Sequence, residues 1–198
     1  MGLIIGNLAW IFASYLLGAV PFSFIVGWLK GVNLLDVGSK SSGSTNVYRL
    51  LGLKFAVVTF LLDMSKGYVS MWIAYHINGY DNGWVVLAGL AAMAGHTFTP
   101  FLRFKGGKGV ATGVGLMLFI DPVIAIIGFL LEMIIIKATR YVSVASIIVA
   151  VAILIMSFVP FFGIIPLYRY LILIAVVYII YKHIPNIQRL MNNQENKI

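Results

Sequence analysis

The sequence predicts an all-α integral membrane protein, a seven-transmembrane-helix bundle with short or partial helices in the middle. Three observations support this fold class. Of the 198 residues, 61% are hydrophobic and 10% are charged, whereas soluble domains are about half apolar and about a quarter charged. Mean hydropathy is +1.00, and apolar residues extend along the whole chain. Almost all Lys and Arg residues lie in short segments between or after the apolar stretches. These observations exclude a soluble enzyme and predict a single membrane domain over residues 1–198.

Seven apolar segments have compositions typical of helices that cross or enter a bilayer. In order they are Leu3–Trp28, Phe55–Ile77, Trp84–Leu102, Gly109–Ile120, Val123–Ile136, Val142–Val159 and Pro166–Tyr181. The first is too long for a signal peptide and has no basic residues before it. The fourth and fifth are short, and the pair Asp121–Pro122 separates them. We expect two short helices there, and one kinked helix is the alternative.

The positions of the basic residues predict the orientation of the chain. Four segments hold almost all Lys and Arg: Lys30–Lys54, Arg103–Lys108, Lys137–Arg140 and the tail from Lys182. Seven crossings that start with the N-terminus outside place all four on the cytoplasmic side, as the positive-inside rule expects. The net charge of +8 is then explained by membrane lipid and orientation, without a nucleic-acid partner. The chain has no cysteine, so a disulfide or a thiolate site is excluded.

The cytoplasmic loops contain more glycine and hydroxyl groups than orientation alone requires. The run "DVGSKSSGSTNVYR", Asp36–Arg49, combines Gly38 and Gly43 with short hydroxylated side chains. Exposed backbone N–H groups, hydroxyls and the bidentate guanidinium of Arg49 together favour a phosphate cradle. A flexible solvated loop that ends in a helix cap is an equally open interpretation of this stretch.

The second apolar segment contains "DMSKG", which places Asp63 and Lys66 on one helix face. Charges within a membrane helix face the bundle interior or the interface and usually pair. We expect Asp63 to orient Lys66 or another cation, and a purely structural clamp is the alternative.

The densest positive charge lies on the most flexible backbone, in "FLRFKGGKGVATGVG" at Phe101–Gly115. Lys105 and Lys108 bracket Gly106 and Gly107, and a helix is expected to begin near Gly109. Glycines permit close backbone approach, and a helix N-terminus favours anions. A Walker P-loop is excluded because glycine follows the lysine. We therefore predict a phosphate site, with topological charge as the alternative.

Two histidines are candidates for acid–base chemistry. His183 and Asn186 are three residues apart in "YKHIPNIQRL", and His96 lies near the end of the third apolar segment. His76 is expected on the opposite side of the membrane. The six acidic residues are scattered without ligand spacing, so we expect no metal site. We expect no other cofactor either.

These motifs resemble the bacterial membrane glycerol-3-phosphate acyltransferases that use acyl phosphate, the PlsY family. The family pattern G-S-G-N-x-G-x-T-N-x-x-R is matched at Gly38, Ser39, Gly43, Thr45, Asn46 and Arg49, with Lys40 and Ser41 replacing the usual glycine and asparagine. The element D-x-x-K-G is matched at Asp63, Lys66 and Gly67. The pattern around G-H…P…F-K-G-G-K-G-V-A-T is matched at Gly95, His96, Pro100 and Phe104–Thr112. Thr139–Ser146 and His183–Leu190 are also similar to the family, so the resemblance runs almost end to end.

The resemblance implies a reaction of phospholipid biosynthesis at the cytoplasmic face of the bacterial inner membrane. An acyl group would pass from acyl phosphate to the 1-hydroxyl of sn-glycerol 3-phosphate, giving lysophosphatidic acid and inorganic phosphate, with no obligate protein partner. The implied catalytic residues are Ser39, Arg49, Lys108, His183 and Asn186. The implied substrate-binding residues are Gly38, Gly43, Thr45, Asn46, Lys66, His96, Lys105, Gly106, Gly107, Gly109, Thr112, Ser143 and Ser146.

Some alternatives stay open at the level of sequence. In one hypothesis, His183 or His96 is the general base that takes the proton of the acceptor hydroxyl. In the other, which we favour, a substrate phosphate with a second pKa near ~6 accepts this proton. A small anion transporter would also use basic glycine turns and an intramembrane ion pair. The polar residues crowd one side, however, so the sequence shows no continuous polar path.

Overall fold

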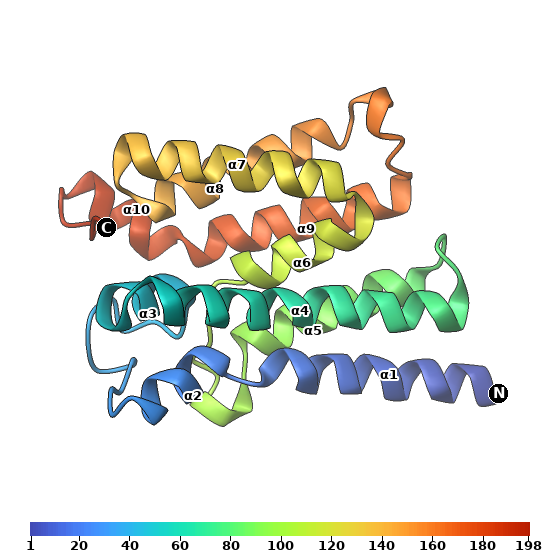
Figure 1. Cartoon of the computed structure of the whole chain (residues 1–198). Coiled ribbons are helices and arrows are strands. Elements are labelled where there is room, and N and C mark those ends of the chain that lie inside the picture. Colours follow the sequence, from blue (N-terminus) through green and yellow to red (C-terminus); the bar gives the residue numbers. More distant parts are fainter. The chain divides into compact units, whose positions relative to one another are not determined.

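The structure is a computed structural model that describes all residues from 1 to 198 (Figure 1). It is helical throughout and forms two compact units, Met1–Leu116 and Met117–Ile198. The boundary between the units falls inside one helix, α6 (Val110–Ile120). The expected single membrane domain over residues 1–198 stays a prediction.

The first unit contains five further α-helices and one short 3₁₀-helix. They are α1 (Gly2–Ala19), α2 (Phe22–Leu29), α3 (Ser44–Leu51), α4 (Leu53–Asn78), α5 (Gly83–Thr97) and the 3₁₀-helix Pro100–Leu102. In the second unit the helices are α7 (Pro122–Thr139), α8 (Val142–Met156), the 3₁₀-helix Pro160–Phe162, α9 (Pro166–Lys182) and α10 (Ile184–Met191).

The first apolar segment is broken, which the sequence analysis did not expect. Pro21 follows the end of α1 and has no N–H to continue the helical hydrogen bonds. Side chains from elsewhere in the unit satisfy the carbonyl groups at the break. Thr99 Oγ1 donates to the Ala19 carbonyl oxygen at 2.6 Å, and Lys66 Nζ donates to that of Val20 at 2.5 Å. The break is therefore held by tertiary contacts.

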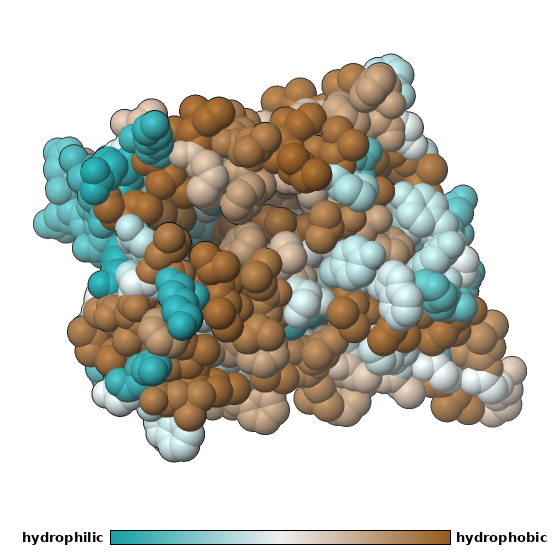
Figure 2. All heavy atoms as spheres, in the orientation of Figure 1, coloured by the Kyte–Doolittle hydropathy of each residue, from teal (hydrophilic) through white to brown (hydrophobic).

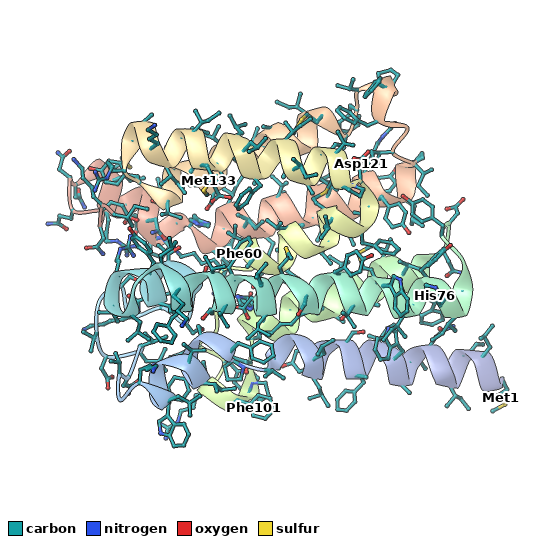
Figure 3. All side chains as sticks on the ribbon, viewed as in Figure 1. Met1, Phe60, His76, Phe101, Asp121 and Met133 are labelled. Atoms are coloured by element: carbon teal, nitrogen blue, oxygen red, sulfur yellow. The ribbon has the colours of Figure 1, made fainter.

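Helices α1 and α5 approach each other through small residues. A Cβ atom on Gly18 would lie 2.0 Å from the carbonyl oxygen of Ala92, and one on Gly95 would lie 2.0 Å from that of Tyr15. Glycine at such positions lets membrane helices pack backbone to backbone. At the other end of α1, the side-chain amides of Asn7 and Asn78 donate to each other at 2.9 and 2.7 Å. His76 lies at this same end, away from the loop that carries Phe101 (Figure 3).

The second unit confirms the expected interruption at Asp121–Pro122 as two separate helices. Asp121 caps α7, since its carboxylate accepts from the Ile124 N–H at 2.9 Å, and Pro122 occupies the first helical position. Further along, Ser146 of α8 donates to Glu132 of α7 at 2.8 Å. On α9, Arg169 Nε donates to the Ser157 carbonyl oxygen at 3.0 Å.

Three helical segments are long and apolar enough to cross a membrane: Gly2–Leu29, Gly83–Leu102 and Pro122–Thr139. A fourth results if α9 and α10, which are bent by 47°, count as one span. Helices α6 and α8 are apolar but shorter, and the charged residues of α4 dilute its hydropathy. Apolar side chains cover most of the face shown in Figure 2, and hydrophilic side chains gather around the C-terminal segment. These features are those of an all-helical membrane protein.

Candidate functional site

The loop before α3 is organised by one amide side chain, that of Asn46. Its Nδ2 donates to the carbonyl oxygens of Leu34, Val37 and Ser41 at 3.0, 3.2 and 3.1 Å. Its Oδ1 accepts from the Ser39 N–H at 2.9 Å. Asn46 is almost fully buried, and buried polar groups need such partners. The structure therefore shows the predicted substrate-binding Asn46 as the centre of the loop's own hydrogen bonds.

Two residues of this loop have the left-handed backbone conformation that glycine favours. Gly38 has a φ of +66°, and a Cβ atom there would lie 2.3 Å from Asn46 Oδ1. Lys40 stands where the resembled family has glycine, and its φ is +51°, in the left-handed region. Lys40 thus adopts a backbone conformation that glycine reaches more easily than other residues.

The remaining predicted residues of this stretch lie close together along the chain. Ser39 precedes α3, Gly43 is its N-cap, and Thr45 and Arg49 lie on it four residues apart, which places them on one helix face. All are partly buried. The structure therefore places Thr45 and Arg49 on one short helix, in a stretch that the sequence analysis had treated as a loop.

Asn46→Ala is expected to lower the free energy of unfolding by about 1–3 kcal/mol, because it leaves buried partners unsatisfied. Hydrogen exchange should show faster exchange over residues 34–43, together with a lower melting temperature. Asn33→Ala is the matched control in the same loop, since Asn33 is exposed and bonds only to neighbours there. Equal protection of residues 34–43 in wild type and Asn46→Ala would contradict this role.

The second predicted segment, Lys105–Gly109, folds back onto the end of α5. The Gly106 N–H donates to the Thr97 carbonyl oxygen at 2.9 Å, and the Gly107 N–H donates to that of His96 at 3.2 Å. A Cβ atom on Gly106 would lie 2.1 Å from the His96 carbonyl oxygen. The sequence analysis expected these two N–H groups to face a phosphate. The structure shows them anchoring the turn to α5.

The anchored turn leads directly into α6. Gly109, with a φ of +83°, precedes the first helical residue Val110, and the first N–H groups of any helix have no intrahelical acceptor. Lys105 is exposed and Lys108 is partly buried. Thr112 is fully buried and donates to the Asp63 carbonyl oxygen at 3.2 Å. The arrangement presents two ammonium groups and a helix start, which together favour an anion.

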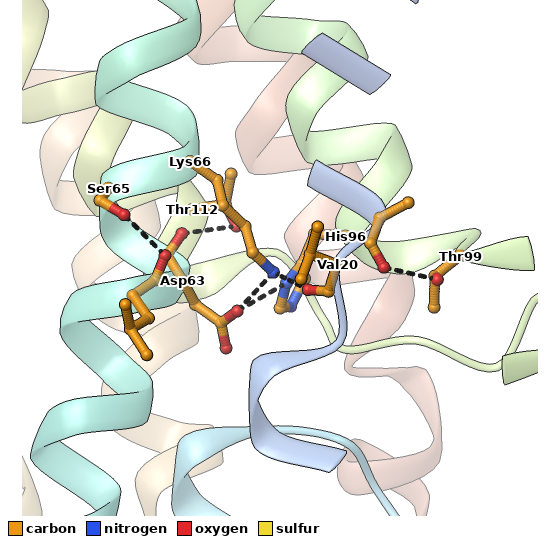
Figure 4. Close-up of polar contacts among 9 residues, drawn as sticks. Val20, Asp63, Ser65, Lys66, His96, Thr99 and Thr112 are labelled. Carbon is orange, nitrogen blue, oxygen red and sulfur yellow. Dashed lines mark hydrogen bonds and ion pairs between the residues drawn. The ribbon is translucent and has the colours of Figure 1, made fainter. Parts of the chain in front are cut away.

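Two predicted residues, Lys66 and His96, belong to a buried ionic cluster with Asp63 (Figure 4). Lys66 Nζ lies 2.6 Å from Asp63 Oδ1 and also donates to the Val20 carbonyl oxygen. His96 Nδ1 lies 3.6 Å from the same Asp63 oxygen. The expected pairing of Asp63 with Lys66 is confirmed. That Lys66 and His96 contact substrate stays a prediction.

In the second unit, Ser143 and Asn186 meet at one carboxylate. Ser143 Oγ and Asn186 Nδ2 donate to Glu195 Oε1 at 2.9 and 2.6 Å, and Arg189 Nε donates to Oε2 at 2.7 Å. The buried His183 ends α9, and its Nδ1 lies 2.8 Å from the Ile179 carbonyl oxygen. A carbonyl oxygen only accepts, so Nδ1 carries the proton and the lone pair of the neutral ring lies on Nε2.

Comparison with known proteins decides the family. Residues 8–193 match the family model described as glycerol-3-phosphate acyltransferase. The chain belongs to this acyltransferase family. The glycerol-3-phosphate acyltransferase of Fusobacterium nucleatum is 42% identical, over 93% of this chain and 94% of that protein. That of Aquifex aeolicus is 40% identical, over 93% and 95%.

Two solved structures resemble this acyltransferase along almost its whole length. Both are crystal structures of PlsY (YgiH), an integral membrane glycerol 3-phosphate acyltransferase. The glycerol 3-phosphate form has a TM-score of 0.92 and 37% identity, over 98% of this chain and 96% of that one. The lysophosphatidic acid form has a TM-score of 0.90 and 36% identity, over 98% and 95%.

Sequence reasoning missed two acidic residues of this acyltransferase. Glu195 collects three donors, and Glu132 accepts from Ser146, a predicted substrate-binding residue. For Glu132 a signal was available, because it is an isolated acidic residue within an apolar helix. Charged residues in such helices usually face the interior of the bundle. Nothing in the tail sequence marks Glu195. No group of three His, Cys, Asp or Glu side chains is placed to hold a metal ion.

Glu195→Gln is expected to lower the melting temperature of this acyltransferase near neutral pH. Burial would raise the pKa of the Glu195 carboxyl group, but hydrogen bonds from Asn186, Arg189 and Ser143 outweigh it, so the pKa lies below its ordinary value. A carboxyl group whose pKa is lower in the folded state than in the unfolded state stabilises the fold at pH values above its unfolded pKa, which is about 4.3 for Glu. This stabilisation is lost as pH falls through the folded-state pKa.

The difference in melting temperature between wild type and Glu195→Gln should therefore shrink below about pH 4. Asp81→Asn, at an exposed turn residue, is the matched control and should change little. A difference that grows on acidification would show that the Glu195 contacts act in another way.

Proposed function

We propose that this chain moves a fatty acyl group from acyl phosphate to the 1-hydroxyl of sn-glycerol 3-phosphate. The products are lysophosphatidic acid and inorganic phosphate, and the reaction belongs to phospholipid biosynthesis. The observation that carries the proposal is the Lys105–Gly109 turn, which is anchored to α5 and leads into the start of α6. Both proposed substrates carry a phosphate group, and this turn combines the cations and the helix start that bind one.

The relatives support the choice of acceptor and product. One related structure is described as the glycerol 3-phosphate form and another as the lysophosphatidic acid form. We transfer both molecules to this chain because it shares the fold along almost its whole length. Acyl phosphate as donor follows from the sequence resemblance.

The proposed chemistry suits cations and hydrogen-bond donors. The acceptor hydroxyl oxygen forms a bond to the acyl carbonyl carbon, and the bond from that carbon to the phosphate oxygen breaks. The leaving phosphate takes the bonding electron pair, and Lys108, Arg49 and nearby hydroxyls stabilise the developing negative charge. We favour a substrate phosphate as the acceptor of the hydroxyl proton. His183 is the alternative base, since Nε2 holds its lone pair.

We also propose the topology that the basic segments favour. Seven segments cross or enter the membrane, including the charged α4 and the shorter α6 and α8. The N-terminus is outside, and the C-terminus and the site face the cytoplasm of a bacterial cell, at its inner membrane. The distribution of Lys and Arg supports this orientation.

The test is an assay of the purified full chain in detergent with palmitoyl phosphate and glycerol 3-phosphate, without added metal. We expect release of phosphate that depends on the acceptor, formation of lysophosphatidic acid, and no product from palmitoyl-CoA. Phosphate release without the acceptor, or transfer from palmitoyl-CoA only, would overturn the proposed reaction. Anion flux through liposomes without acyl transfer would indicate a transporter instead.

A further inference from the structure

The ionic cluster of Asp63, Lys66 and His96 has no part in the chemistry described above. Asp63 and Lys66 are each 1% exposed and His96 is 8% exposed. Removing three such groups from water costs several kcal/mol unless partners compensate. The contacts of the cluster therefore indicate which parts of the unit it holds in place.

One oxygen atom of Asp63 contacts both Lys66 and His96. Asp63 Oδ1 accepts from Lys66 Nζ at 2.6 Å and lies 3.6 Å from His96 Nδ1 (Figure 4). Lys66 is fixed on its other side by the Val20 carbonyl oxygen and by the ring of Phe22, 4.8 Å from Nζ. The carboxylate thus has little freedom to turn, and it gives the His96 ring a defined orientation.

The oriented ring of His96 lies directly against the glycine turn. A Cβ atom on Gly107 would be 2.1 Å from His96 Nε2, so the ring and this backbone are in contact. The same residue holds the turn through its main chain, because its carbonyl oxygen accepts from the Gly107 N–H at 3.2 Å. His96 therefore contacts the turn on two sides, and it contacts Asp63 on a third.

We propose that His96, oriented by Asp63, is a positioning residue that holds the Gly106–Gly107 turn so that Lys108 and the start of α6 meet the phosphate of a substrate. The inference rests on the proposed function in one respect, namely that this turn binds a phosphate. His96 itself does not need to touch the substrate. Its effect passes through the turn that follows it in the chain.

A comparison of three variants tests this role. His96→Leu removes both ring nitrogens, and His96→Asn keeps an amide near the position of Nδ1 that still faces Asp63. His76→Leu is the matched control, because His76 is exposed and lies in the last turn of α4. The measurements are KM and kcat for both substrates, calorimetric titration with inorganic phosphate, and melting temperature.

We expect His96→Leu to raise the KM of the substrate whose phosphate binds the turn by about 10- to 100-fold, because small misplacements of a binding group have large effects. Affinity for inorganic phosphate should fall in parallel, whereas kcat changes much less. His96→Asn should recover part of both losses, and His76→Leu should match the wild type. If His96→Leu does not fold, His96→Asn against wild type and control gives the same comparison.

Three results would overturn the proposal. They are wild-type KM and phosphate affinity in the folded His96 variants, a lower melting temperature with unchanged KM, and no binding of phosphate by the wild type. Failure of the proposed function is seen separately. A wild type that binds phosphate but transfers no acyl group would refute the enzyme, and the phosphate titration would still measure the effect of His96 on the turn.

Discussion

Lys108→Ala is expected to lower kcat/KM for acyl transfer by about 10²–10³-fold, the cost typical of removing one group that stabilises developing charge. The reason lies in its position. Lys108 follows the two anchored glycines and precedes the start of α6, so its ammonium group adds a full charge to the partial charge of the helix N-terminus. The measurement is the initial rate of phosphate release over a range of both substrate concentrations.

Lys54→Ala is the matched control for Lys108→Ala. Lys54 is an exposed lysine in the first turn of α4 and lies in the same basic region of the sequence. Its loss should change the rate by no more than a few-fold, because an exposed charge in water interacts weakly with distant groups. Similar rates for Lys108→Ala and Lys54→Ala would refute a specific role for Lys108.

Gly106→Ala is expected to lower kcat/KM by about 100-fold, since it displaces the turn that positions Lys108. A Cβ atom there would lie 2.1 Å from the carbonyl oxygen of His96 and 2.6 Å from that of Thr97. Both are backbone atoms at the end of α5, so no side chain can rotate away. The turn must then give up the hydrogen bond from the Gly106 N–H to Thr97.

Gly83→Ala provides the control for Gly106→Ala, because a Cβ atom on Gly83 meets nothing within 4 Å. Steady-state kinetics, with circular dichroism to confirm an unchanged helix content, would compare the two. An active Gly106→Ala enzyme with wild-type KM values would mean that the turn tolerates a side chain and does not depend on close packing against α5.

Several helices followed from the sequence because their signals are local. Hydrophobic length predicted α4, α7 and α9, and the pair Asp121–Pro122 predicted the interruption before α7. The same reasoning failed at α1 and α2. An uninterrupted apolar run does not reveal that Thr99 and Lys66 satisfy the carbonyl groups on either side of a break at Pro21.

Short helices were missed for a related reason. Helices α3 and α10 have eight residues each, too few for intrinsic preference to form a helix without packing. In α3 the apolar side is held by a small core of Leu34, Val47 and Ala56, which joins a loop to two helices. Such contacts between distant segments leave no local pattern in the sequence.

The sequence was sufficient for the membrane fold class, the family and the segments that carry the site, because hydropathy, charge and motif spacing are properties of neighbouring residues. It was not sufficient for the role of each side chain. Asn46 is engaged by its own loop and Lys66 by the break after α1. Ser143 and Asn186 share the carboxylate of Glu195. A buried polar group needs a hydrogen-bond donor or acceptor. Only folding brings the partners of these side chains within hydrogen-bond distance.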